Sequence, residues 1–166
     1  VYNKDGIIPF VEGLKKLGYT LYSSGGTANK IKEAGIEVHD VAELVGGGAI
    51  LGHKVVTLSR EISAGILADP TNEKEMKEME TLGLPIIDLV CVDCYPLAEA
   101  LAMSDVKREF VLEKTDIGGP TMLRAAAKGR RSHGDFRLTG SRSERIIADR
   151  NSGRPEPVSE YRLAKR

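Results

Sequence analysis

Apolar residues recur along the chain in two alternating patterns, helical spacing and short continuous runs. Helical spacing predicts helices over residues 7–17, 28–34, 73–82, 97–103, 106–113 and 121–128. Short runs bounded by turn residues predict strands over residues 20–23, 36–38 and 86–92, and residues 55–58 fit a strand or an extended loop. Strands that alternate with helices indicate βαβ units. We therefore expect an α/β fold with a largely parallel sheet.

The pattern weakens after Lys128. Residues 136–139 fit a further strand, and Ile146 and Ile147 fit a short helix. Glycine, proline and charged residues dominate the rest of this region. We therefore expect one main domain over residues 1–140 and a weakly structured, basic C-terminal extension over residues 141–166.

Composition narrows the function classes. Hydrophobic residues make up 41% of the 166 residues and charged residues 29%, which is typical of a globular protein. No apolar run is long enough to span a membrane, so we expect no membrane partner. Two cysteines argue against a disulfide scaffold and favour a cytoplasmic protein. Tryptophan is absent and aromatic residues make up 5%, so we expect no nucleic-acid partner.

Charge is balanced overall but unevenly distributed. From Lys128 to Arg166 there are eleven lysines and arginines against five acidic residues. This basic segment could be a patch for an anionic partner. We favour a solvated tail, because acidic residues are interleaved with the basic ones and aromatic residues are scarce.

A glycine-rich turn, Ser24-Gly25-Gly26-Thr27, precedes the second predicted helix. A helix N-terminus offers free backbone N–H groups and a positive dipole end to an anion, and glycine permits close approach. Lys4 would lie at the same sheet edge if the first two strands are neighbours. The turn therefore predicts a phosphate site, or a plain tight turn with a helix cap.

A second glycine-rich turn, residues 117–120, opens the helix that ends at Lys128. Asp116 precedes the turn, and Arg124 lies four residues before Lys128 on the same helix face. These residues fit either a solvated basic stripe or a carboxylate and an ammonium that converge on a pocket. Both interpretations stay open at this point.

The strongest predicted strand ends in a cluster of polar residues. Asp93 and Tyr95 are two residues apart, so they would point to the same side of an extended chain, at the presumed ligand edge. Cys91 and Cys94 have the spacing of a CxxC motif, but the sequence lacks a second such pair. We therefore expect buried cysteines and no metal.

Four segments, taken in order, carry a resemblance to a known family: residues 1–6, 17–36, 88–96 and 115–128. The last, Thr-Asp-Ile-Gly-Gly-Pro-Thr-Met-Leu-Arg-Ala-Ala-Ala-Lys, is the most specific. Together they resemble the inosine monophosphate (IMP) cyclohydrolase domain of the bifunctional purine-biosynthesis enzyme that also acts as AICAR transformylase. That domain has a methylglyoxal-synthase-like fold, which implies a three-layer α/β/α arrangement.

The chain departs from this family at the central motif Gly-Arg-Val-Lys-Thr-Leu-His-Pro. The aligned stretch keeps Thr57, but Lys54 stands at the arginine position and Val56 at the catalytic lysine position. Ser59-Arg60 stands at the His-Pro pair, and Asp93 occupies a position where the family has asparagine. Lysine can replace arginine as a point charge but not as a bidentate donor, and valine cannot donate a proton.

The resemblance implies that a formylated imidazole-carboxamide ribonucleotide closes to IMP with loss of water, without cofactor or metal. It also implies a purine ribonucleotide as ligand and a homodimer. The candidate catalytic residues are Lys54, Thr57, Tyr95, Asp116 and Lys128. The candidate phosphate- and nucleotide-binding residues are Lys4, Ser24, Gly25, Gly26, Thr27, Asp93, Ile117, Gly118 and Gly119.

Three functional hypotheses follow. The first is a working cyclohydrolase whose oxyanion is stabilised by Lys54 or Lys128, and the intact block over residues 115–128 favours it. The second is a nucleotide-binding or regulatory module that has lost the chemistry, and Val56 favours that one. The third, a relative of methylglyoxal synthase acting on a triose phosphate, lacks the expected pair of aspartates. We place the first hypothesis ahead.

Overall fold

The computed structural model describes residues 1–52, 54–129, 136–139 and 145–149. Its helices are α1 (Ile7–Lys16), α2 (Gly25–Glu33), α3 (Arg60–Leu67), α4 (Glu73–Thr81), α5 (Leu97–Leu101), α6 (Arg108–Glu113) and α7 (Gly118–Lys128), with the 3-10 helix η1 (Val41–Glu43). Its strands are β1 (Tyr22–Ser23), β2 (His39–Asp40), β3 (Leu89–Asp93), β4 (Phe136–Thr139) and β5 (Arg145–Asp149).

The described strands form two small sheets. β1 pairs with β2 in parallel, because α2 carries the chain back to the starting end between them. In the other sheet the order is β3-β5-β4, and both pairs are antiparallel. Strand pairing is therefore parallel at the N-terminal side and antiparallel at β3, a mixture that the βαβ pattern did not predict.

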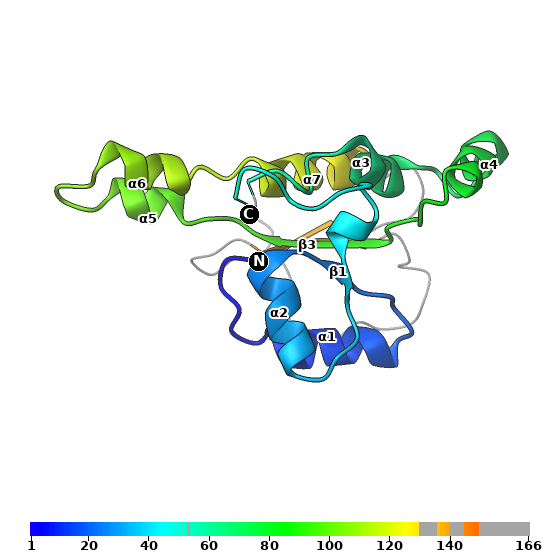
Figure 1. Cartoon of the computed structure of the whole chain (residues 1–166), viewed down its shortest axis with the longest axis horizontal. Coiled ribbons are helices and arrows are strands. Elements are labelled where there is room, and N and C mark those ends of the chain that lie inside the picture. The colour runs from blue at the N-terminus through cyan, green and yellow to red at the C-terminus, as the bar shows by residue number, and fades with distance from the viewer. Residues whose placement is uncertain (53, 130–135, 140–144, 150–166) are drawn as a thin grey trace.

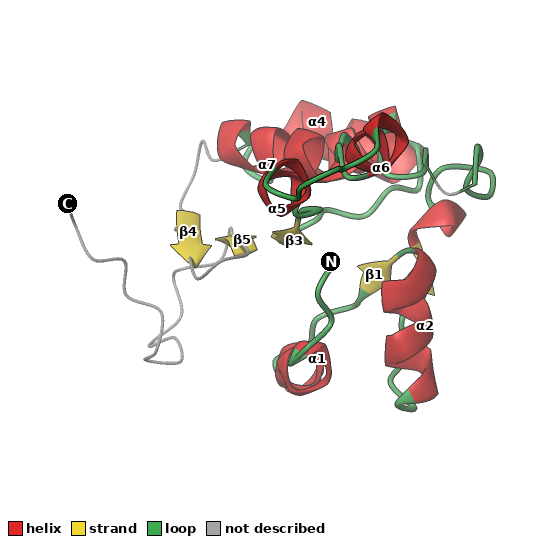
Figure 2. Cartoon of the chain, turned by 90° about the vertical axis from the view of Figure 1, so that its left-hand side faces the viewer, coloured by secondary structure: helices red, strands yellow, loops and turns green. Residues whose placement is uncertain are grey.

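Helices lie on both sides of the strands, which confirms the α/β fold class (Figure 2). Helices α3 to α7 lie above β3, while α1 and α2 lie below it with β1 (Figure 1). The pair α5–α6 projects beyond one end of the strand layer (Figure 1). The N-terminus lies between β1 and β3 in the view of Figure 2 and just below β3 in that of Figure 1.

Two apolar clusters hold these layers together. One joins α3, α7 and β3, and its buried members include Ile62, Ile66 and Val92. The other joins α1, α2 and β1, and its buried members include Ile31 and Leu21. Ile62, Ile66 and Ile31 are each only 2% exposed. Almost all of each side chain is therefore removed from water, which stabilises the fold.

Most predicted helices are confirmed, within a few residues at their ends. α1 begins after Gly6, which adopts a left-handed φ of 71°, and the chain leaves it at Gly18 with φ 85°. These conformations suit glycine because it has no Cβ. The last predicted helix begins earlier than expected, at Gly118, so the glycine-rich turn is itself the first turn of α7.

The sequence analysis missed α3. The Ser59 hydroxyl accepts a hydrogen bond from the Ile62 backbone N–H at 3.1 Å, which caps the start of this helix. Ile62 and Ile66, four residues apart, face the core. The serine cap and this spacing both indicate a helix, but the sequence analysis predicted only a strand or an extended loop over residues 55–58 and compared the stretch up to Arg60 with the family motif.

The prediction of a short helix at Ile146 and Ile147 is wrong, because both lie in strand β5 and pair with β3. Two adjacent apolar residues fit either element, and the pairing with β3 decides between them. β5 falls within the range predicted as an extension. Residues 141–144 and 150–166 of that range lie outside the described residues, so the boundary at residue 140 stays a prediction.

Candidate functional site

The first candidate group is the start of α2 together with Lys4. Ser24 is extended and makes no side-chain hydrogen bond to the helix, and Gly25 has a φ of 53°. A Cβ on Gly26 would lie 3.5 Å from Lys4 Cε and 3.9 Å from Nζ, so the lysine side chain lies against the glycine turn. Lys4 and the turn therefore meet, as the strand order predicted, and together present an ammonium and a helix N-terminus.

The Thr27 hydroxyl is turned toward the N-terminal residue. It accepts a hydrogen bond from the Val1 amino group at 3.4 Å and donates one to the Val1 carbonyl at 3.3 Å. Thr27 is buried, at 8% exposure. The Thr27 side chain therefore fixes the position of the N-terminal residue. In the same segment, Lys4 Nζ donates a hydrogen bond to the Tyr2 carbonyl at 3.3 Å.

The second candidate group is the start of α7. The Gly119 backbone N–H donates to Asp116 Oδ1 at 3.0 Å. A Cβ on Gly119 would lie 2.6 Å from Asp116 Oδ2 and 2.9 Å from Val92 Cγ1, while one on Gly118 would lie 2.6 Å from Thr57 Oγ1. Both glycines are thus required for close approach, and they hold Thr57 and Asp116 at one helix end.

Asp93, at the end of β3, is almost fully buried, at 3% exposure. Its Oδ2 accepts from the Asn3 backbone N–H at 2.7 Å, and its carbonyl accepts from the Tyr2 N–H at 3.0 Å. Its Oδ1 has no hydrogen-bond partner within the described part of the chain. Leaving such a buried acceptor unpaired typically costs about 1–3 kcal/mol, so Oδ1 offers a position for a donor.

The two groups meet around Val1. Burial lowers the pKa of its amino group below the usual value, and the charge of Lys4 lowers it further. Interactions with Cys91, Asp93 and Asp116 act in the opposite direction and raise this pKa. Lys4, Asp93 and Asp116 are therefore all close enough to one point to interact with it electrostatically.

An aromatic cluster that the sequence analysis did not single out borders this region. The rings of Tyr2 and Tyr95 meet edge to face, with centroids 5.4 Å apart. Lys114 Nζ lies 4.9 Å from the centroid of Tyr2, 5.2 Å from that of Phe110 and 5.6 Å from that of Tyr95. Three aromatic residues thus surround one cation, although aromatic residues make up only 5% of the sequence.

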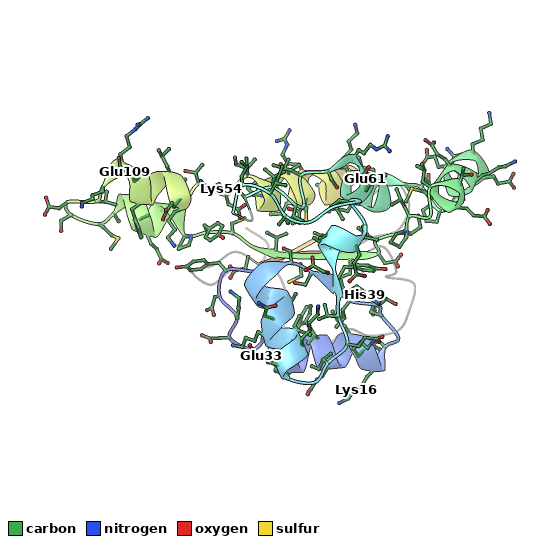
Figure 3. All side chains as sticks on the ribbon, viewed as in Figure 1. Lys16, Glu33, His39, Lys54, Glu61 and Glu109 are labelled. Atoms are coloured by element: carbon green, nitrogen blue, oxygen red, sulfur yellow. The ribbon has the colours of Figure 1, made fainter. Side chains whose placement is uncertain are left out.

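The two predicted catalytic lysines differ in where they lie. Lys128 is the last residue of α7, so it is about 15 Å along the helix axis from Gly118. Lys54 is exposed on the loop between η1 and α3, on the same side of β3 as α3 and α7 (Figure 3). Ile117, at the start of α7, is 62% exposed. The structure therefore brings together the two glycine turns, Asp93 and Tyr95, but not Lys128.

Within the described residues, no group of three or more histidine, cysteine, aspartate or glutamate side chains is arranged to hold a metal ion. No helix in the same part of the chain has both the length and the apolar character needed to cross a membrane.

Comparison with known proteins gives a consistent result. The family model of the MGS-like domain matches residues 6–121. The chain is 47% identical over 128 residues to the bifunctional purine biosynthesis protein PurH of Caldicellulosiruptor saccharolyticus, covering 77% of this chain and 25% of that protein. It is 46% identical over 129 residues to PurH of Shouchella clausii, with the same two shares.

The chain thus spans about a quarter of the length of these curated relatives. Among solved structures, the crystal structure of ForH matches with a TM-score of 0.62 at 38% identity. This match covers 76% of this chain and 64% of ForH. The resemblance inferred from the motifs is confirmed.

Proposed function

Because this chain belongs to the MGS-like domain family, and its curated relatives are bifunctional purine biosynthesis proteins, we propose that it is an IMP cyclohydrolase-type enzyme. Its reaction is the ring closure of formylated aminoimidazole carboxamide ribonucleotide to IMP. The observation that carries the proposal is that the first glycine turn and Asp93 both contact the N-terminal segment, while the start of α7 holds Asp116 close to Val92, the neighbour of Asp93. A site of that shape holds a phosphate at one end and polar groups at the other.

The chemistry needs orientation and proton transfer. The carboxamide nitrogen attacks the formyl carbon, a C–N bond forms, and negative charge develops on the formyl oxygen. One proton from the carboxamide nitrogen and one from the formamido nitrogen end up on that oxygen, which leaves as water when the C=N bond to the formamido nitrogen forms. Holding the two groups in contact removes much of the entropic barrier, and donors aimed at the developing oxyanion lower the rest.

At the phosphate end, we assign the anion to the start of α2. The contact between Lys4 and Gly26 supports this assignment, since it sets an ammonium beside free backbone N–H groups. The phosphate-binding residues of this proposal are Lys4, Ser24, Gly25, Gly26 and Thr27.

At the base end, Asp116 is the proposed proton carrier, because its Oδ1 is held by the Gly119 N–H while Oδ2 faces the helix start. The unpartnered Oδ1 of Asp93 is the proposed acceptor for an N–H of the ligand. The other residues of the proposed base end are Thr57, Tyr95, Ile117, Gly118 and Gly119, with Lys54 on the exposed loop before Thr57 and Lys128 as a more distant cation.

We also propose that the protein forms a homodimer in the cytoplasm. The exposed apolar residues on the loop after η1 support an interface there, since Ile50 is 59% exposed and Leu51 is 71% exposed. The interface would involve this loop, over residues 46–60, and α7.

The test of the proposed reaction is turnover of the formylated ribonucleotide, with IMP separated by chromatography and compared with the uncatalysed rate. IMP formation above that rate supports the enzyme. IMP binding without any turnover would instead favour a nucleotide-binding module, and neither binding nor turnover would reject both.

A further inference from the structure

The ammonium of Lys114 is held over three aromatic rings, and none of its hydrogen atoms is used by a neighbour in the described residues. The backbone N–H of Lys114 donates to the carbonyls of Phe110 at 3.2 Å and Val111 at 3.1 Å, which fixes the residue at the end of α6. From there Nζ lies within 5.6 Å of the ring centroids of Tyr2, Phe110 and Tyr95. The electron-rich faces of such rings attract a cation without occupying its N–H donors.

The three rings come from three separate parts of the structure. Tyr2 belongs to the N-terminal segment, Tyr95 follows β3, and Phe110 lies in α6. Holding a flexible lysine against all three restricts where its ammonium can be, which is the property that a positioned electrostatic group requires. The α5–α6 pair that carries Phe110 is visible at one end of the strand layer (Figure 1).

The position of the ammonium relates it to the proposed site. The Tyr2 backbone N–H donates a hydrogen bond to the Asp93 carbonyl at 3.0 Å. Tyr2 also follows Val1, whose amino group interacts electrostatically with Asp93 and Asp116. Lys114 itself lies two residues before Asp116 in the chain. The cation therefore stands beside Tyr95 at the border of the base end, whereas Lys128 lies at the far end of α7.

This chain has an uncharged residue at the position that the family motif gives to a catalytic lysine. Val56 stands where a lysine was expected, and its neighbour Thr57 has Oγ1 against the start of α7. A valine side chain cannot stabilise a developing oxyanion. Resting on the proposed function, we propose that Lys114 supplies this missing cation, donating an N–H to the formyl oxygen as the C–N bond forms.

The experiment compares kcat and KM for ring closure in five variants: Lys114→Met, Lys114→Arg, Lys107→Met, Val56→Lys and the double variant Lys114→Met with Val56→Lys. Lys107 is an exposed lysine that precedes α6, so Lys107→Met is the matched control for loss of one charge. Circular dichroism and a thermal melt establish that each variant is folded, and Lys114→Gln replaces Lys114→Met if the latter does not fold.

We expect Lys114→Met to lower kcat by about 100- to 1,000-fold, the usual loss for one oxyanion donor. KM should change by less than about threefold, because the phosphate is held elsewhere. Lys114→Arg should keep kcat within about tenfold of the wild type, since the charge is retained. Lys107→Met should leave both constants unchanged.

The double variant shows whether Lys114 acts on the formyl oxygen or only packs against the aromatic rings. If both side chains serve the same oxygen, Val56→Lys should raise kcat at least about tenfold more in the Lys114→Met background than in the wild type. Equal gains in both backgrounds would overturn the proposal, as would a Lys114→Met kcat within about threefold of the wild type. Absence of turnover in the wild type would instead overturn the proposed function itself.

Discussion

Replacing Gly119 by alanine should destabilise this protein, although the same change in the middle of most helices is stabilising. The added Cβ would lie 2.6 Å from Asp116 Oδ2 and 2.9 Å from Val92 Cγ1. Val92 is only 5% exposed and belongs to the core between α3, α7 and β3, so it cannot retreat without disturbing its neighbours. The Asp116 side chain can move, but only by giving up its hydrogen bond from the Gly119 N–H.

Three effects determine how much the Gly119→Ala replacement changes the free energy of unfolding. Alanine stabilises a helix by up to about 1 kcal/mol relative to glycine. Forcing one methyl group into a filled core costs about 1–3 kcal/mol. Losing a hydrogen bond to a carboxylate costs about 1.5–3 kcal/mol. The unfavourable effects dominate, so the free energy of unfolding should fall by about 2–4 kcal/mol.

Urea denaturation followed by circular dichroism measures this change. The matched control is Gly13→Ala in α1, where nothing lies within 4 Å of the added Cβ. That variant should be more stable than the wild type by about 0.5–1 kcal/mol. The two identical replacements should therefore have opposite signs. A Gly119→Ala protein at least as stable as the wild type would refute the close approach of α7 to β3.

The other predictions concern the proposed function. Gly26→Val should weaken binding of a nucleotide monophosphate at least about tenfold by calorimetry, because a larger side chain meets Lys4 and blocks the backbone; unchanged affinity would remove the phosphate assignment. Light scattering should detect a homodimer, and a particle of 18.0 kDa alone would contradict it. Val56→Lys should raise the cyclisation rate, whereas Lys128→Ala should change it by less than about threefold, because Lys128 lies at the far end of α7 from Asp116. Loss of cyclisation in Lys128→Ala would contradict this separation.

Local patterns predicted the helices better than the strands. The periodicity around Val11 and the charged helix around Met79 each match an observed helix, because one apolar face against a core determines both. β5 could not be recognised from Ile146 and Ile147, since it is a strand through its pairing with β3. Strand identity of this kind depends on a partner that is distant in the sequence.

The residues of the candidate site also fall into those that local sequence patterns predicted and those that they did not. Glycine turns that open helices are visible in a sequence, so Gly26 and Gly119 were found. The ring cluster around Lys114 was not, because its members are spread along the chain and no spacing rule connects them. The sequence did indicate that Lys128 lies at the far end of α7 from Asp116, because the predicted helix starts after the turn that follows Asp116 and ends at Lys128.

The two apolar clusters have a consequence for the order in which the chain can fold during synthesis. The buried members of the cluster between α1, α2 and β1 all lie within residues 7–38. Those of the other cluster extend from Val41 to Ala126. The first cluster can therefore close as soon as its short segment has left the ribosome. The second has to wait until α7 has emerged, so α3 and β3 remain exposed to chaperones until then.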